Sequence, residues 1–351
     1  MKHLLKAATA AGILTVSALQ AQADTVLIAN EPGPNRGARA HALEFLAEQI
    51  KERTNGSVTV DQNWGGALFK ANAALDSLSA GVADMGVIIG AYAESEFPEL
   101  QMGGLLLKPA HPWVMMKAMY ELFTTNEYVK GRMEEMNLVY VNSFSLSPGI
   151  LACRGKGIRT VADIAGTKVA HTGASGEIFA ALGGNMVKMP IYDVFQGMET
   201  GLVDCSVTYA YFAVATNLNE QVDTMVDLKL STVTSLATFI NKFTFDSLSP
   251  EEQEAILSTG ADMTDYYGEY LQEADDKAMA ALAEGENAVE FVEFPAEEYP
   301  VLHATAGPLI EKWEQDVANH GGDGEALLAE LYALMDKWTA VMETEGLPWE
   351  R

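Results

Sequence analysis

The chain has 351 residues, of which 48% are hydrophobic, and it carries 49 acidic against 22 basic side chains, a formal net charge of −27 at pH 7. A chain of this length is enough for two domains of ordinary size. So acidic a chain repels polyanions, which argues against nucleic acid and anionic lipid as partners but does not identify a ligand.

The first 23 residues have the pattern of a cleavable signal peptide. Lys2 and Lys6 give a basic start, residues 7–19 form an apolar core, and an A-x-A cleavage site ends at Ala23. The apolar core is too short to span a membrane. We therefore expect cleavage after Ala23 and export to the periplasm. The mature chain would have 328 residues (351 − 23) and a charge of −29, since 20 basic side chains remain (22 − 2).

The first part of the mature chain alternates apolar runs with segments of helical periodicity. Continuous apolar runs are typical of buried strands, and apolar residues three and four apart are typical of helices. Glycine and Asn-Gly turns separate the segments. The pattern predicts strands over 25–30, 57–60, 84–89 and 138–144, and helices over 38–53, 71–79, 112–123 and 127–136.

A later segment, residues 158–212, repeats this alternation at short range. It predicts strands over 167–171, 187–190 and 202–204, and helices over 175–182 and 192–199 that end at glycines. Strand, helix, strand is the pattern of a parallel sheet with helices on its faces. Ligands bind at the carboxyl ends of such strands, so residues 170–173 and 204–211 form a candidate pocket rim.

Three runs in this segment carry a family resemblance: DIAGTKV (163–169), ALGGNMVKMP (181–190) and YDVFQGMETGLVD (192–204). They resemble the second lobe of the extracytoplasmic solute-binding proteins of TRAP transporters, the dicarboxylate-binding DctP-like family. Three positions depart from the family pattern. The family's clamping Arg falls on Ala170, the Gly after Asp204 is Cys205, and the usual Asn falls on Thr208.

The resemblance implies an α/β fold with two lobes, as in periplasmic binding proteins, in which helices cover both faces of mixed sheets. We expect residues 24–145 plus 237–300 in lobe 1, residues 146–236 in lobe 2, and C-terminal helices in residues 301–351 that pack on the lobes. Ser249 as N-cap and Pro250 at N1 predict the start of a helix that continues to Gly285. At helical rise its length is roughly 50 Å, and the resemblance implies that it braces both lobes.

Four basic side chains near expected strand ends or helix starts are candidate anchors for a ligand carboxylate: Arg36, Arg39, Arg154 and His171. A buried Arg holds a carboxylate through two parallel hydrogen bonds, and Ala170 cannot supply them. Arg36 lies in a loop entering a helix, where backbone N–H groups also favour an anion. Equally, Arg36 and Arg39 fit a solvated helix face, and Arg154 fits an ordinary charged turn.

Aromatic side chains are dense at the expected rim: Trp64, Tyr92, Phe144, Tyr209, Tyr211 and Phe212. They suit stacking on a flat ligand or a cation–π cage for an amine. The candidate counter-ions for an amine are Glu31, Glu94, Glu177 and Asp204. Core packing is the ordinary alternative, above all for Phe144 and Phe212. The predicted ligand-binding residues are Arg36, Trp64, Tyr92, Arg154, His171, Thr208, Tyr209 and Tyr211.

Cys153 and Cys205 are the only cysteines. In an oxidising compartment they form either a disulfide or two small buried thiols, and the sequence leaves both open.

Motifs of catalysis are missing, since the chain has no P-loop, G-x-G-x-x-G or H-E-x-x-H, and Ser175 is not in a G-x-S-x-G elbow. We therefore expect no enzyme, cofactor or metal. The expected function is the periplasmic solute-binding component of a TRAP transporter, a monomer that delivers a small organic acid to the membrane subunits. An aromatic carboxylate such as a hydroxybenzoate is favoured. The alternatives are a small amine such as ethanolamine, a secreted enzyme acting on a small metabolite, and an adhesive module.

Overall fold

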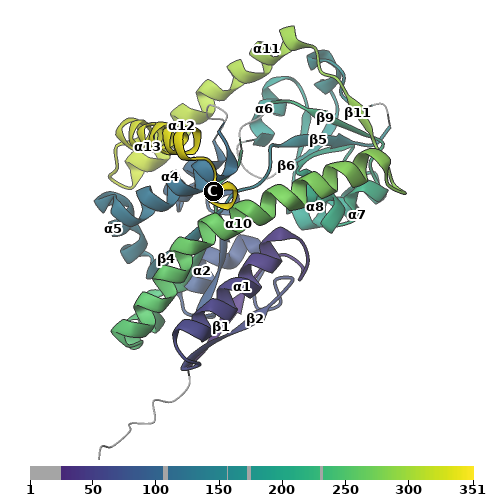
Figure 1. Cartoon of the computed structure of the whole chain (residues 1–351). Coiled ribbons are helices and arrows are strands. Elements are labelled where there is room, and N and C mark those ends of the chain that lie inside the picture. The colour runs from purple at the N-terminus through teal and green to yellow at the C-terminus, as the bar shows by residue number, and fades with distance from the viewer. Residues whose placement is uncertain (1–24, 106–109, 156, 172–174, 230–231) are drawn as a thin grey trace, which may run out of the picture.

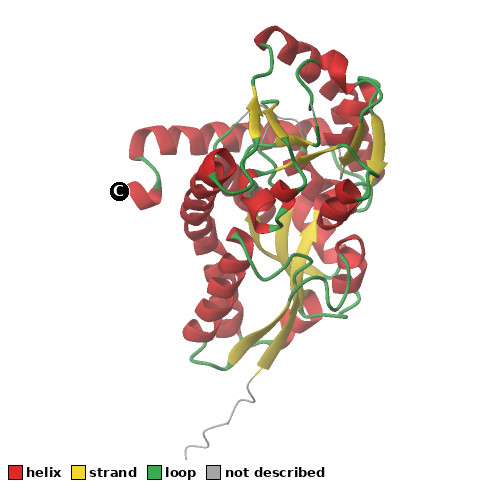
Figure 2. Cartoon of the chain, turned by 90° about the vertical axis from the view of Figure 1, so that its right-hand side faces the viewer, coloured by secondary structure: helices red, strands yellow, loops and turns green. Residues whose placement is uncertain are grey.

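The computed structural model describes residues 25–105, 110–155, 157–171, 175–229 and 232–351, so the predicted signal peptide lies outside the described residues. The chain forms two lobes, each built on a mixed β-sheet, and the two sheets lie one above the other in Figure 2. Helices flank both sheets, as the resemblance implied. Within the described ranges, no helix is both long and apolar enough to cross a membrane.

The sheet of lobe 1 has five strands in the order β2-β1-β3-β10-β4. Strand β10 is antiparallel to both of its neighbours and returns to this sheet after the chain has built lobe 2. The strands of the sheet are β1 (Thr25–Asn30), β2 (Val58–Asn63), β3 (Met85–Ile89), β4 (Leu138–Phe144) and β10 (Leu236–Asn241). All residues of β3 and β10 are buried, as expected for strands inside a sheet that is covered on both faces.

The sheet of lobe 2 has six strands in the order β11-β9-β5-β8-β6-β7. They are β5 (Ile150–Cys153), β6 (Lys168–His171), β7 (Asn185–Lys188), β8 (Cys205–Thr208), β9 (Thr224–Asp227) and β11 (Glu290–Val292). The sequence placed residues 237–300 in lobe 1, but β11 pairs with β9, so this strand completes the sheet of lobe 2.

Another prediction in lobe 2 was wrong. The apolar run at 202–204 is not a strand: the backbone amides of Leu202 and Val203 bond to Gly197 and close the end of a helix, and the strand begins at Cys205.

Thirteen helices lie in the described part of the chain. They are α1 (Ala38–Arg53), α2 (Ala74–Ser79), α3 (Pro98–Gln101), α4 (Pro112–Thr125), α5 (Glu127–Glu135), α6 (Ser175–Ala181), α7 (Val194–Glu199), α8 (Ala210–Ala215), α9 (Lys242–Ser247), α10 (Pro250–Glu284), α11 (Tyr299–His303), α12 (Gly307–Asn319) and α13 (Gly324–Glu345). Helix α13 packs on α4 of lobe 1, whereas α11 lies by lobe 2 (Figure 1).

The longest helix, α10, runs across the molecule and contacts both lobes (Figure 1). It begins with a reciprocal capping box in which Ser249 and Glu252 each bond the other's backbone amide. It packs against α1 and β4 of lobe 1 and against α8 of lobe 2. Gly260 permits the contact with β4, because a Cβ there would lie 2.1 Å from the carbonyl oxygen of Val141. The sequence-based prediction of this helix is confirmed.

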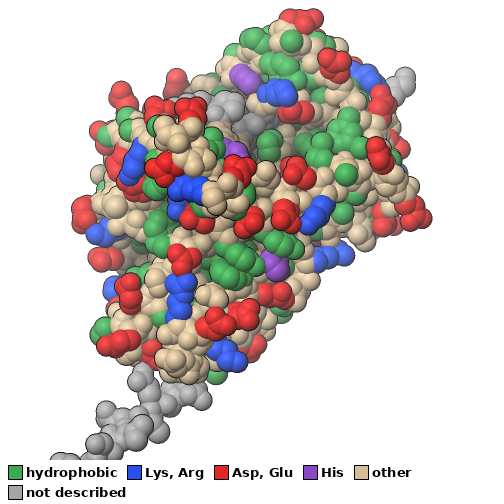
Figure 3. Space-filling model, in the orientation of Figure 1, with side chains coloured by type: hydrophobic (Ala, Val, Ile, Leu, Met, Phe, Trp, Pro, Cys, Tyr) green, Lys and Arg blue, Asp and Glu red, His purple; other side chains and the backbone are tan. Residues whose placement is uncertain are grey.

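Three buried apolar clusters hold these layers together. One spans the joint between the lobes and joins Leu27 of β1, Met263 of α10 and Met225 of β9. A second fills the other face of the first sheet, where Phe239 packs with Leu331 and other residues of α13. The third covers the far face of the second sheet. Acidic side chains are spread over the visible surface with Lys and Arg among them (Figure 3), in line with the negative net charge.

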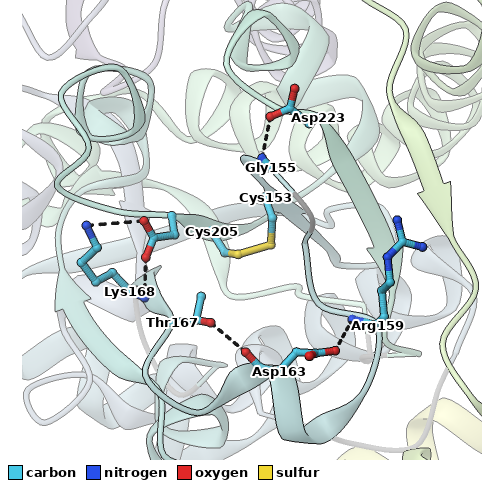
Figure 4. The surroundings of a disulfide bond; sticks show 9 residues. Cys153, Gly155, Arg159, Asp163, Thr167, Lys168, Cys205 and Asp223 are labelled. Carbon is cyan, nitrogen blue, oxygen red and sulfur yellow. Dashed lines mark hydrogen bonds and ion pairs between the residues drawn. A yellow bond between two sulfur atoms is a disulfide. The ribbon is translucent and has the colours of Figure 1, made fainter.

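The two cysteines form a disulfide within lobe 2. Cys153 of β5 and Cys205 of β8 face each other in the antiparallel pair, with a Cα–Cα distance of 4.1 Å (Figure 4). Beside the bond, Asp163 and Asp204 accept hydrogen bonds from backbone amides, which holds the connecting loops against the strands. The structure thus selects the disulfide of the two alternatives that the sequence left open.

Candidate functional site

A pocket lies at the joint between the lobes. The space between its walls, including the part open to solvent, is about 810 Å³. Its walls combine residues of lobe 1, lobe 2 and the crossing segments: Arg39, Ile89, Ala91, Tyr92, Gln101, Gly104, Leu146, Met189, Ile191, Tyr192, Val194, Ser206, Val207, Tyr209, Phe212, Val233, Ser235 and Leu236. A mostly apolar wall with a few polar groups is typical of a small-molecule site.

Strand ends from both sheets position the walls. In lobe 1, β3 ends at Ile89 opposite Leu236, where the antiparallel β10 begins, so both contribute to the same sheet edge. In lobe 2, β8 ends at Thr208 and leads directly into Tyr209. The carboxyl ends of β3 and β8 therefore meet at the pocket, as the position of ligands on such sheets predicts.

Within the described part of the chain, Arg39 is the one charged side chain in the pocket wall. It lies in the first turn of α1 and its side chain is only 10% exposed. Its Nη2 donates to Glu31 Oε1 at 2.7 Å and to the hydroxyl of Tyr192 at 2.6 Å, and its Nε donates to Glu31 Oε1 at 3.2 Å. Glu31 also accepts from the backbone amide of Gly33 at 2.7 Å.

This pairing decides the charge state of the Arg39 guanidinium. Burial by itself lowers the pKa of Arg39, but the attraction of the Glu31 carboxylate and its hydrogen bonds outweigh burial, so the pKa is raised and the group stays cationic. Among the described residues, the hydrogen bonds of this guanidinium use Nε and Nη2 and leave Nη1 without a partner. The free side of the guanidinium can therefore donate to a ligand.

Two hydrogen bonds join the lobes at this site. Tyr192 belongs to the short 3-10 turn η5 (Ile191–Asp193) of lobe 2, and its hydroxyl accepts from Arg39 of lobe 1. In the reverse direction, the backbone amide of Ile191 donates to the hydroxyl of Tyr92 of lobe 1 at 3.1 Å. A molecule bound here would contact groups that already connect the two lobes.

The remaining wall is apolar with hydroxyl groups at intervals. Burial raises the pKa of Tyr192 and of Tyr209, so both phenols are protonated at neutral pH. Met189, Val207, Phe212 and other apolar side chains provide contact area between them. The site can thus bind a flat, largely apolar molecule with one anionic group and a few polar substituents.

Of the residues predicted from the sequence, the structure places Tyr92 and Tyr209 in the pocket wall. Arg36 and Arg154 are exposed and lie outside it; Arg36 lines a neighbouring depression, and Arg154 donates to the carbonyl of Met198.

Three further predicted residues also lie outside the wall. Thr208 is fully buried at the end of β8, and Tyr211 lines the neighbouring depression with Arg36. Trp64 packs against the core of the joint. His171 ends β6, and its side chain lies outside the described residues.

The proposed counter-ions for an amine are also elsewhere. Glu31 is 1% exposed and bound to Arg39. Glu94 and Glu177 line a different depression together with Lys312, and Asp204 pairs with Lys168 at 3.4 Å. Among the described residues, no group of three or more His, Cys, Asp or Glu could hold a metal ion.

The sequence contains a signal that Arg39 points inward, but Arg39 was not among the eight predicted ligand-binding residues. Arg39 is followed at intervals of four, three and four residues by Leu43, Leu46 and Ile50, all of which are buried. This helical spacing places Arg39 on the inward face of α1. Arg36 precedes the helix and has no such phase. Gln101 and Ser235 were also missed, and no periodic pattern singled them out.

Comparison with known proteins assigns the chain to a family. The family model described as bacterial extracellular solute-binding protein, family 7 (DctP), matches residues 32–316. The chain belongs to this family. Its members are solute-binding proteins that work with the membrane components of TRAP transporters, and the resemblance seen in the sequence is confirmed.

Individual relatives are distant but match over most of the chain. A solute-binding protein of Albidiferax ferrireducens is 25% identical over 290 residues, which cover 80% of this chain and 79% of the relative. The ectoine/5-hydroxyectoine-binding periplasmic protein UehA of Ruegeria pomeroyi is 22% identical over 330 residues, which cover 93% of this chain and 95% of UehA.

Solved structures show the same two-lobe fold. A TRAP solute-binding protein from Rhodoferax ferrireducens in complex with copurified benzoate superposes with a TM-score of 0.80 at 19% identity, covering 90% of this chain and 99% of that one. A marine metagenome TRAP protein specific for aromatic acid ligands, in complex with 3-hydroxybenzoate, gives a TM-score of 0.78 at 20% identity, covering 90% and 99%.

Proposed function

We propose that this solute-binding protein acts in the periplasm, captures a small organic acid with an aromatic body, and delivers it unchanged to a TRAP membrane transporter. The observation that carries the proposal is Arg39, a cationic side chain with a free donor edge in an otherwise apolar and aromatic interlobe wall. The aromatic ring would pack against Tyr209 and Phe212 while the carboxylate accepts from the guanidinium. Exported proteins of this family carry signal peptides, which fits residues 1–23.

The same wall disfavours an amine. An ammonium group would lie beside the cationic Arg39, and the buried carboxylate nearest to it, Glu31, already accepts from Arg39. Glu94 is outside the pocket, next to Lys312. The structures with bound benzoate and 3-hydroxybenzoate support an acid, because they share this fold over nine-tenths of the chain.

Isothermal titration calorimetry tests the proposal with benzoate and ethanolamine as ligands. Removing Arg39 alone would leave Glu31 buried without a partner, so the variant to use is the neutral pair Glu31→Gln/Arg39→Gln. Loss of a charge-assisted hydrogen bond should weaken benzoate about ten- to a hundredfold. Arg36→Ala and Arg154→Ala are matched controls, since both remove an exposed Arg outside the wall and should leave the affinity unchanged.

Two results would overturn the proposal. One is a parent protein that binds ethanolamine but no aromatic acid. The other is a neutral pair variant that still folds, as its melting temperature shows, and binds benzoate as tightly as the parent.

A further inference from the structure

Gln101, the last residue of α3, lines the pocket and has a buried amide oxygen that the protein itself does not use. The residue is 5% exposed and lines the interlobe wall, and its Oε1 atom has no hydrogen-bond partner among the described residues. Buried polar atoms are nearly always paired, because an unpaired one loses its hydration without compensation. An unpaired acceptor on the wall of a ligand pocket points to a donor on the ligand.

The surroundings hold this amide in place. An added Cβ at Gly90 would lie 3.2 Å from Gln101 Oε1, and one at Gly104 would lie 3.3 Å from both Oε1 and Nε2. The two glycines therefore allow the backbone to approach the amide closely from two sides. The Gln101 side chain is therefore closely packed by backbone, which restricts its movement.

Besides the pocket, Gln101 and Arg39 each border a different neighbouring depression. Arg39 also lines the depression that contains Arg36 and Tyr211, and Gln101 also lines the depression that contains Glu94 and Lys312. The depression beside Arg39 and the depression beside Gln101 have no residue in common. A ligand that reaches both must carry its acid and its hydrogen-bond donor on separate ends.

We propose that the natural ligand is a hydroxylated aromatic acid whose hydroxyl donates to Gln101 Oε1 while its carboxylate binds at Arg39. This inference rests on the proposed function, because it assumes an aromatic acid in the pocket. Gln101 then determines specificity: a ligand without the hydroxyl leaves Oε1 unpaired, and a ligand with a methoxy group at that place brings a second acceptor against it.

Calorimetry with four ligands tests the role of Gln101 in the parent protein: benzoate, 3-hydroxybenzoate, 4-hydroxybenzoate and 3-methoxybenzoate. We expect one of the hydroxybenzoates to bind about two- to tenfold more tightly than benzoate, and 3-methoxybenzoate to show no gain. In Gln101→Met, which keeps a similar volume, the gain from the hydroxyl should disappear while the affinity for benzoate stays the same. Gln49→Met on α1, outside the pocket, is the matched control.

The outcomes separate the two proposals. If no aromatic acid binds, the proposed function is wrong. If benzoate binds but neither hydroxyl adds affinity, or if 3-methoxybenzoate binds most tightly, the role of Gln101 as acceptor is wrong and the proposed function stands. The same holds if Gln101→Met weakens all four ligands equally, because the residue would then support the pocket without reading the hydroxyl. The comparison of ligands on the parent protein does not depend on how the variant folds.

Discussion

Reduction of the Cys153–Cys205 disulfide is expected to lower the free energy of unfolding of lobe 2 by about 4 kcal/mol. The bond joins β5 to β8 across a sequence separation of 52 residues. A crosslink over such an interval removes roughly 14 cal/mol/K of loop-closure entropy from the unfolded chain, which is about 4 kcal/mol at room temperature. The interval contains β6, α6, β7 and α7, so the elements that lose stability on reduction are those on the lobe 2 side of the pocket.

Urea unfolding of the oxidised and the reduced protein measures this drop in the free energy of unfolding, because the two forms have the same sequence and differ only at the two cysteines. The five tryptophans lie at positions 64, 113, 313, 338 and 349, outside residues 146–236, so their fluorescence reports lobe 1 and the C-terminal helices. Far-ultraviolet circular dichroism reports both lobes. Reduction should lower the urea midpoint of the dichroism signal by about 1–2 M at an m value of 2–3 kcal/mol/M.

The fluorescence midpoint should fall less than the dichroism midpoint, unless the lobes unfold as one unit, in which case both fall together. The variant Cys153→Ala/Cys205→Ala, which cannot re-form the bond, should behave like the reduced chain. Equal midpoints for oxidised and reduced protein, at unchanged m value, would refute the reasoning.

Two other predictions concern stability. Gly260→Ala should destabilise the protein by about 1–3 kcal/mol in thermal unfolding, because the new Cβ meets the Val141 carbonyl of β4. Gly131→Ala in α5 is the control: nothing lies within 4 Å of the new Cβ, so it should stabilise the protein by about 0.5–1 kcal/mol. Equal effects of the two substitutions would contradict the close packing of α10. Burial raises the pKa of Asp275, so stability is lost as the pH rises from the unfolded-state pKa to the folded-state pKa, and the full cost applies above the folded-state pKa. Asp275→Asn should therefore gain up to about 1 kcal/mol in urea unfolding at pH 7 and nothing near pH 3, and a gain that persists at low pH would count against this cause.

Much of the fold was predictable from the sequence where apolar pattern, capping residues and turn residues all indicate the same element. The predicted bounds of the strand at Thr25–Asn30, the helix at Ala38–Arg53 and the strand at Leu138–Phe144 match the structure. Each is an apolar run or a periodic stripe between glycine, asparagine or polar breaks. The long helix was predictable for the same reason, since Ser249 caps its first turn and no later residue up to Gly285 forces the backbone out of the helix.

The remainder depended on pairings that local sequence does not encode. β5 and β9 have four residues each, too few for a periodic signal. They form strands because they pair with each other, and because β5 also pairs with β8 and β9 with β11. The membership of β11 in the second sheet follows from its contact with β9, more than sixty residues earlier. In the site, Tyr92 and Tyr209 were named from their places near strand ends, but the choice among the arginines needed the phase of α1, which turns Arg39 inward.

Under the proposed function, Arg39 would hold the acid in place of the clamping arginine of the family. Ala170, at that position, is fully buried in the second lobe and contributes no charge. The cationic group comes instead from α1 of the first lobe, where Glu31 already neutralises it. The Arg39–Glu31 pair has no net charge, so its long-range attraction for an anion is small, while the free edge of the guanidinium still donates to an acid at short range and disfavours an ammonium group. Affinity must then come from hydrogen bonds that are shielded from water and from apolar contact area. Both favour an aromatic acid over a small dicarboxylate. Because Tyr192 of the second lobe bonds the same guanidinium, an acid bound there would also strengthen the joint between the lobes.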